Sequence, residues 1–335
     1  MTVMRRFSAA QLVLTLAGAI LLWAVVAGAS LFFGSDGWKA PANAYALGVR
    51  LDSVLLASLI GASLAAAGLA YQAILRNPLA DPYLLGVSSG AMLANYLWRL
   101  PGFSALAVLG ALSQQATAFA GALLAVIAVF GLATRRGRLD PVTLLLVGVI
   151  VNATNASAFL MIDALKPELT AQGGGPLRFL VGGINTNLEP VQKYTGLVVF
   201  ALGFVALMAM AGRLNVAALS ESEAQSLGVR IHRLRWVALV TASLMTASAV
   251  ALSGPIGFVG LICPHLARLI VGQDNRRLLP LSAALGAMLL TVADGTSRML
   301  IGKLDTWLPV GVLTGLLGGP FFLVLLYRGR QRTPD

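Results

Sequence analysis

The sequence predicts an all-α polytopic membrane protein with about ten transmembrane helices, folded as a single domain over residues 1–335. First, 58% of the residues are hydrophobic and only 11% are charged, whereas a soluble domain carries about 25% charged residues. Second, apolar runs of about 20 residues, the length that a helix needs to cross a bilayer, recur along the whole chain. Third, the 36 glycines are expected where membrane helices pack closely.

Ten apolar stretches follow one another, separated by more polar connections. The third is weak because Pro78 and Pro82 break the chain just before it, and the eighth because glycines and prolines recur between residues 254 and 264. Two weakened spans, one in each half of the chain, are typical of a transporter built from internal repeats. The expected spans are residues 9–33, 51–75, 83–99, 105–133, 142–165, 192–212, 236–253, 256–272, 278–300 and 307–327.

The N-terminus carries Arg5 and Arg6 ahead of an apolar run that continues to Phe33. A secretory signal peptide shows the same order of charge and apolar residues, but its apolar core is shorter than this run. We therefore expect a first membrane helix that the two arginines hold on the cytoplasmic side.

The basic residues predict the orientation, because they accumulate in cytoplasmic connections. If the N-terminus is inside, sixteen of the 24 basic residues fall on the inner side and eight on the outer side. This bias predicts a multi-pass protein with both termini in the cytoplasm. The eight outer residues are Lys39, Arg50, Arg99, Lys166, Arg178, Lys193, Arg298 and Lys303.

No cluster of catalytic residue types is found in the sequence, so we expect a protein that is not an enzyme. His232 and His265 lie far apart, and no group of Cys and His has the spacing of a metal site. The phosphate-binding loop Gly-x-x-x-x-Gly-Lys-Ser/Thr is also missing, so we expect no stably bound metal or cofactor, and ATP with Mg²⁺ would act in a partner subunit. The net charge of +11 is scattered between the apolar runs, which argues against a nucleic-acid partner.

Four segments, in order and well spaced, carry a more specific signal. They are Arg76-Asn-Pro-Leu-Ala-Asp-Pro-Tyr-Leu-Leu-Gly-Val-Ser-Ser-Gly-Ala91, the Leu-Ser-Glu-x-x-Ala-x-x-Leu-Gly-Val pattern within 213–235, Ser253-Gly-Pro-Ile-Gly-Phe-Val-Gly-Leu-Ile-Cys-Pro-His-Leu-Ala-Arg268, and Ala293-Asp-Gly-Thr-Ser-Arg298. Together they resemble the permease subunits of the ABC importers for iron–siderophore complexes, haem and vitamin B12, the FecCD or B12-permease-like family.

This resemblance implies a B12-permease-like fold and a set of partners. The permease would form a homodimer in the lipid bilayer of the bacterial inner membrane, with two ATPase subunits on its cytoplasmic side and a substrate-binding protein on its periplasmic side. Transport would proceed by alternating access, driven by ATP in the ATPase subunits.

The segment 213–235 is the expected coupling segment. Ser220 and Glu223 have the spacing of a capping box that begins a short helix, and Gly228 is well placed to end it. By pattern alone, an ordinary solvated loop is equally compatible. The resemblance implies that this segment docks on the ATPase and transmits its motion through Glu221, Glu223, Ala224, Leu227 and Gly228.

Two outer arginines are the expected docking residues for the binding protein. Arg298 stands four residues after Asp294, so the two can form an ion pair on one helix face. The resemblance implies that Arg50 and Arg298 contact acidic residues of the binding protein. The family pattern Arg-Leu-Pro-Arg is not kept here, because Asp52 and Ser53 stand in place of the proline and the second arginine.

Small polar residues mark the expected translocation path. Asn152, Thr154 and Asn155 recur within the fifth span and predict a polar helix face, which could be either a seam between helices or a pore lining. The resemblance implies a cavity or gate role for them. The same role is expected for four residues of the first broken segment, which are Pro78, Pro82, Ser88 and Ser89.

His265 and Arg178 allow more than one interpretation. A histidine behind Pro264 could simply pack between helices, could hold the helix break, or could touch a haem iron in passing. Arg178, in the expected outer mouth, could attract an anionic substrate or could be a plain surface charge.

The function that these observations favour is the permease of an ATP-driven importer for an iron complex, either haem or a ferric siderophore. A vitamin B12 importer of the same family is the first alternative. An ion-coupled secondary transporter, with Asp294 as the coupling acid, is an alternative from another class.

Overall fold

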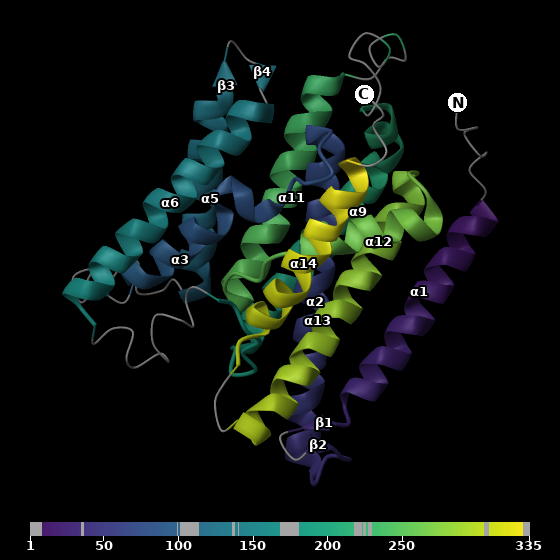
Figure 1. Cartoon of the computed structure of the whole chain (residues 1–335), viewed down its shortest axis with the longest axis vertical. Coiled ribbons are helices and arrows are strands. Elements are labelled where there is room, and N and C mark those ends of the chain that lie inside the picture. Colours follow the sequence, from purple (N-terminus) through teal and green to yellow (C-terminus); the bar gives the residue numbers. More distant parts are fainter. Residues whose placement is uncertain are drawn as a thin grey trace.

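The computed structural model describes most of the chain. The described residues form ten α-helices, one short 3-10 turn and two hairpins of two residues per strand (Figure 1). They are residues 9–34, 37–98, 100, 114–135, 138–139, 141–167, 181–217, 223, 226, 230–304 and 308–330.

The helices follow the order of the predicted spans. They are α1 (Ala9–Ser30), α2 (Ala44–Leu75), α3 (Val87–Trp98), α5 (Gln114–Ala133), α6 (Pro141–Leu165), α9 (Pro190–Ala217), α11 (Ile231–Ser253), α12 (Val259–Val271), α13 (Asn275–Leu304) and α14 (Val310–Arg330). The 3-10 turn η1 (Pro82–Leu85) precedes α3. The hairpins pair β1 (Phe33–Gly34) with β2 (Gly37–Trp38) and β3 (Thr134–Arg135) with β4 (Arg138–Leu139).

The predicted all-α membrane fold is confirmed, with one correction to the third and eighth spans. Seven of the described helices are long and apolar enough to cross a membrane. In contrast, α3 has 12 residues and α12 has 13, so each is only about 20 Å long and is too short to cross alone. Chain breaks immediately before both helices shorten them.

The central element is α2, whose membrane-spanning part is almost entirely buried, whereas very few residues of α1 are buried. α2 begins seven residues before the predicted span because the Asn43 side chain accepts a hydrogen bond from the Ala46 N–H (2.8 Å). It ends where Arg76 adopts a left-handed conformation with φ 50°. Its 32 residues, about 48 Å long, contact α9, α11, α12 and α13.

Glycine pairs let neighbouring helices approach α2 closely. A Cβ atom on Gly61 would overlap the backbone of Gly286 in α13, and one on Gly68 would overlap the backbone of Gly260 in α12. Small residues at both sides of a crossing are the usual means by which membrane helices pack.

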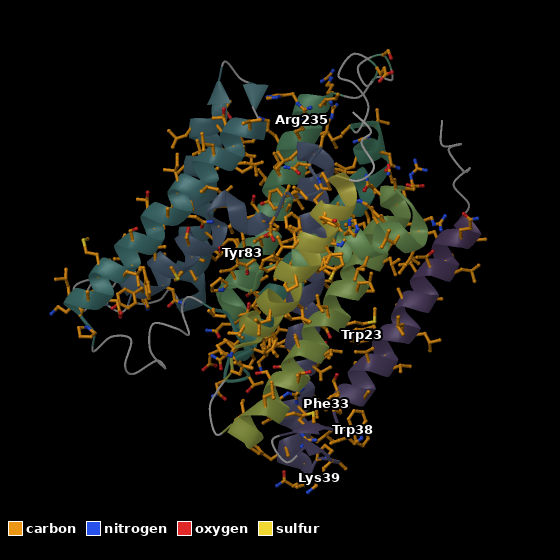
Figure 2. The ribbon with its side chains drawn as sticks, viewed as in Figure 1. Trp23, Phe33, Trp38, Lys39, Tyr83 and Arg235 are labelled. Atoms are coloured by element: carbon orange, nitrogen blue, oxygen red, sulfur yellow. The ribbon has the colours of Figure 1, made fainter. Side chains whose placement is uncertain are left out.

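The two ends of the bundle are distinct. The first residue of α1 and the last residue of α14 lie at the same end, as an even number of crossings requires (Figure 1). Arg235 also lies towards this end, whereas Trp38 and Lys39 of the β1–β2 hairpin lie at the opposite end (Figure 2).

Candidate functional site

The first chain break joins α2 to α3. After Arg76, the Asp81 side chain accepts a hydrogen bond from the Tyr83 N–H (2.9 Å) and so caps η1, which Pro82 begins. Gly86, with φ 76°, ends η1 and lets the chain turn into α3.

The second break joins α11 to α12. Gly254 has φ 70°, and Phe258 has φ 68°, a left-handed conformation that is uncommon for any residue other than glycine. The ring of Phe258 lies directly against Gly318 of α14, where a Cβ atom would overlap it. Close packing against α14 therefore holds Phe258 in this conformation.

The two breaks meet inside the molecule. The Tyr83 hydroxyl oxygen accepts a hydrogen bond from the Ile256 N–H, which connects η1 with the second break. Pro82 lies beside Gly260, and the Gln72 side-chain amide donates to the Gly260 carbonyl (3.1 Å). Tyr83 lies near the middle of the long axis (Figure 2). Backbone that is irregular at this depth is tolerated only where protein or water satisfies it.

A third segment, residues 181–189, completes the arrangement. The Gly182 N–H donates to the Pro255 carbonyl (2.6 Å), and the Gly183 N–H donates to the Ser253 carbonyl (2.8 Å). On its other side, the Gly311 N–H at the start of α14 donates to the Gly182 carbonyl (2.9 Å). The second break is thus tied to α14 by backbone hydrogen bonds, in addition to the Phe258 contact.

The polar face of α6 braces the first break. The Asn152 side chain donates to the Tyr83 carbonyl (2.6 Å), and the Asn155 side chain donates to Ser89 Oγ (3.2 Å). Thr154 instead lies on the exposed side of α6, so it does not share their face as the sequence pattern predicted. Both asparagines therefore form a seam with the broken segment, whereas Thr154 is open to a lipid or a partner.

The remaining predicted path residues are not all brought together. Ser88 is buried, like Ser89 and Pro82, whereas Pro78 is exposed. His265 is half-buried, and its ring packs edge-on against Phe321 of α14 with the centroids 5.9 Å apart. That contact is the packing role considered for this histidine. Arg178 lies outside the described residues.

The interior next to the breaks is tightly filled. A cavity of about 20 Å³ adjoins Gly254 and Pro255, with Ala91, Met92 and Val250 among its other lining residues. This volume holds about one water molecule. A substrate the size of haem therefore has no room at this point between the helices of one chain.

Most of the predicted coupling residues also lie outside the described residues. They are Glu221, Ala224, Leu227 and Gly228. Glu223 is described and exposed, and its carbonyl accepts a hydrogen bond from the Ser226 hydroxyl (2.7 Å).

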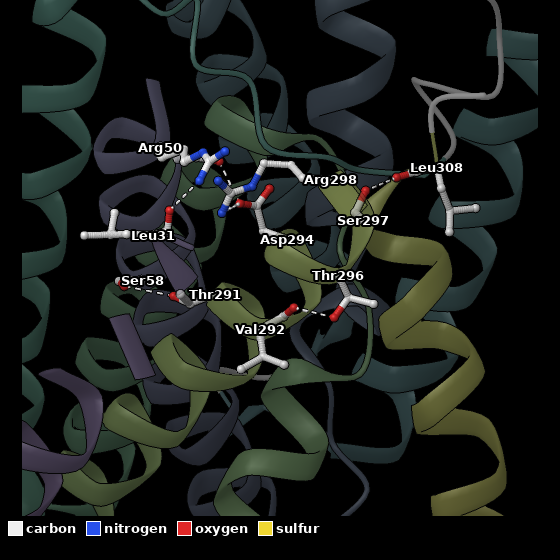
Figure 3. Close-up of polar contacts among 11 residues, drawn as sticks. Leu31, Arg50, Ser58, Thr291, Val292, Asp294, Thr296, Ser297, Arg298 and Leu308 are labelled. Carbon is white, nitrogen blue, oxygen red and sulfur yellow. Dashed lines mark hydrogen bonds and ion pairs between the residues drawn. The ribbon is translucent and has the colours of Figure 1, made fainter. Parts of the chain in front are cut away.

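The predicted docking arginines take part in structural contacts near the β1–β2 hairpin (Figure 3). Arg50 Nη1 donates to the carbonyls of Leu31 (2.7 Å) and Lys39 (2.8 Å), which holds the β1–β2 connection against α2. The predicted Asp294–Arg298 pair is present, with Arg298 Nη2 3.0 Å from Asp294 Oδ2. The Arg298 side chain is only 18% exposed, so it presents little of its charge to the surface.

Ser53 and Asp52, the two departures from the family pattern, also have structural partners. Ser53 donates to Asp294 Oδ2 (2.7 Å), and Asp52 pairs with Lys193 of α9 (2.6 Å). Sequence patterns alone do not indicate these partners, nor the contact between Tyr83 and Ile256. The only available signal is that Asp52 and Ser53 interrupt a motif.

Fold and site together define a multi-pass α-helical membrane transporter subunit whose interrupted helices meet midway across the bundle. The profile of the FecCD transport family matches residues 9–328. The chain belongs to the FecCD transport family, and it is a permease subunit of an ABC importer, in which a separate subunit carries the ATPase.

Similar proteins fit this assignment. The chain is 40% identical to a cobalamin import system permease of Halobacterium salinarum over 83% of this chain and 72% of the relative. It is 37% identical to a hemin transport system permease of Yersinia pestis over 85% of this chain and 84% of the relative. A solved structure described as an inward-facing conformation of a metal-chelate type ABC transporter superposes on this chain with a TM-score of 0.79 and 30% identity. The alignment covers 94% of this chain and 99% of the chain in that structure.

Proposed function

We propose that this permease imports an iron complex, either haem or a ferric siderophore, which a periplasmic binding protein delivers. The observation that carries the importer function is the family match over nearly the whole chain. The choice of cargo rests on less, because relatives of nearly equal identity are named for cobalamin and for hemin. The amino-acid sequence of residues 76–91 favours an iron complex as cargo, because it resembles the family members for iron complexes more closely than those for vitamin B12.

We further propose that two copies form the transporter and that the path lies between them. Two observations support this. The cavity beside the helix breaks is too small for such cargo. In addition, α14 and α6 leave large apolar side chains exposed, including Leu316, Leu317 and Leu323 on α14 and Ile150 on α6. In this arrangement α14, which holds Phe258 and the 181–189 segment, would transmit movement at the subunit interface to both breaks.

The orientation belongs to the same proposal. The arginine-rich end, where α1 begins and α14 ends, would face the cytoplasm of a bacterial inner membrane, as the distribution of basic residues predicts. Two ATPase subunits would bind there on the segment between α9 and α11. The binding protein would dock at the opposite end, around Arg50 and Arg298. No stably bound cofactor is required, and ATP with Mg²⁺ would act in the ATPase subunits.

The proposal is tested by uptake into proteoliposomes that hold this chain with its cognate ATPase and binding protein. Haem, a ferric siderophore, vitamin B12 and molybdate are offered in parallel, with ATP inside. We expect one iron complex to accumulate only when ATP and the binding protein are both present. If only vitamin B12 or only molybdate accumulates, the proposed iron-complex cargo is wrong and that compound is the cargo. Accumulation that needs an ion gradient instead of ATP would overturn the importer mechanism.

The coupling segment is tested by Gly228→Pro. Proline removes a backbone N–H and restricts φ, so it should prevent the turn that Gly228 is expected to make between two short helices. We expect ATP-driven uptake to fall to background while the protein still inserts and remains monodisperse. Gly228→Ala is the matched control, and it should keep most of the uptake if only the turn is required. Normal uptake by Gly228→Pro would remove the coupling assignment.

A further inference from the structure

A groove of about 510 Å³ lies between α1, α9 and α13 at the arginine-rich end of the bundle, away from the helix breaks. One part of it is apolar, formed by Leu12, Met208 and Val216. The other part carries the guanidinium groups of Arg213, in the last two turns of α9, and Arg276, in the first turn of α13. The groove is therefore amphipathic, with its positive charge near the helix ends.

The groove exists because α1 contacts few other helices. The Arg277 side chain donates to the Gln11 side chain (3.1 Å), which fixes the start of α1 to α13. α1 otherwise packs mainly along α13 and leaves the neighbouring face of α9 uncovered. Most of the α1 surface is exposed, so the groove opens towards the surrounding lipid.

The position of Arg276 is built into the fold. A Cβ atom on Gly212 would lie 2.7 Å from Arg276 Nη2, so this glycine provides the space in which the guanidinium rests on α9. The start of α13 is fixed as well, because the Asn215 side chain donates to Asp274 Oδ1 (2.7 Å) and accepts from the Asn275 N–H (2.8 Å).

Positive charge predominates among the described residues beside the groove. Asp274 is the acidic group among the described residues beside the groove, and it accepts hydrogen bonds from Asn215 and from the Arg276 N–H (3.1 Å). Among the described residues at the ends of α9 and α13, Arg213, Arg276 and Arg277 carry positive charge and Asp274 carries negative charge. A ligand that suits the groove carries an anionic group at the helix ends and an apolar part that runs along α1 and α9.

The geometry points to a binding site for an anionic phospholipid, with the phosphate headgroup at Arg213 and Arg276 and an acyl chain along Leu12 and Met208. Basic pockets between helices at the membrane surface bind acidic headgroups by this electrostatic complementarity. The lipid would fill the gap between α1 and α9 and would hold α1 against the bundle. The site does not depend on the cargo, and only the name of the leaflet, cytoplasmic, rests on the proposed orientation.

The test is native mass spectrometry of the purified chain, without ATPase or substrate, titrated with phosphatidylglycerol or phosphatidylcholine of the same acyl chains. We expect wild type to retain phosphatidylglycerol preferentially. Arg213→Gln and Arg276→Gln should each reduce that preference roughly fivefold, and the double variant more. Arg213→Lys should keep the preference because the charge remains. Arg233→Gln is the matched control, since Arg233 is an exposed arginine near the same end but outside the groove.

Three outcomes would overturn the site. Equal retention of the two lipids by wild type, or an unchanged preference in the double variant, would show that the groove does not select an acidic headgroup. Displacement by glycerol 3-phosphate at equal concentration would assign the site to a free phosphate instead. Because no transport is measured, a failed uptake assay leaves this result unaffected.

Discussion

Asp294→Ala is expected to destabilise the permease by about 3–5 kcal/mol, because it leaves the largely buried Arg298 without its counter-charge. Among the described residues, Arg298 Nε and Nη1 have no hydrogen-bond partner that could take over from Asp294. The positive charge of Arg50 also acts on Arg298 and adds repulsion (Figure 3). The measurement is thermal unfolding of the purified protein in detergent, where the variant should melt several degrees lower.

The matched control is Asp52→Ala, which breaks the more exposed Asp52–Lys193 pair. An ion pair at such a position contributes up to about 1 kcal/mol, so the control should melt close to wild type. If both variants melt alike, Asp294 has no special role in stability.

A double variant separates stability from docking. Asp294→Leu with Arg298→Met removes both charges and fills the space with apolar side chains, so we expect most of the stability to return. Binding-protein affinity measured on this variant then tests the docking role without the loss of stability that an unpaired Arg298 would cause. Lower affinity at unchanged stability would support the docking role, whereas equal affinity would leave Arg298 with a purely structural one.

Gly61→Leu is expected to abolish correct folding, because the new side chain would enter the backbone of α13 at Gly286. The obstacle is main chain rather than a flexible side chain, so no rotamer change relieves it. Over-packing of a close interface usually costs about 1–3 kcal/mol, and this crossing should exceed that range because α2 and α13 would have to separate. The measurement is the yield of monodisperse protein by size-exclusion chromatography after membrane extraction.

Gly18→Leu is the control for this prediction. Gly18 lies on the exposed face of α1 with no other atom near the position of a Cβ, so the same substitution should be tolerated. Comparable yields of both variants would contradict the close α2–α13 crossing.

The sequence alone predicted the order of the described helices, because each membrane helix must satisfy its own backbone hydrogen bonds and must be apolar over a known length. It also located both chain breaks from their prolines and glycines. The predicted lengths of the helices after those breaks were wrong, since α3 and α12 are about 20 Å long and do not span the membrane alone. The Asp294–Arg298 pair was predictable because both residues stand on one helix, four positions apart.

The partners between distant segments could not be predicted from patterns. Ser53 bonds to Asp294 across 241 positions, Tyr83 meets Ile256 across 173, and Asn152 reaches Tyr83 across 69. Apolar periodicity specifies that a segment becomes a helix, but not which helix it faces. Which helices face each other depends on close packing, here of Gly61 against Gly286 and of Gly68 against Gly260. This packing exists only once the helices are assembled. The sequence thus determined a polytopic α-helical membrane protein of an importer family, and the tertiary structure decided that its two chain breaks contact each other inside the bundle.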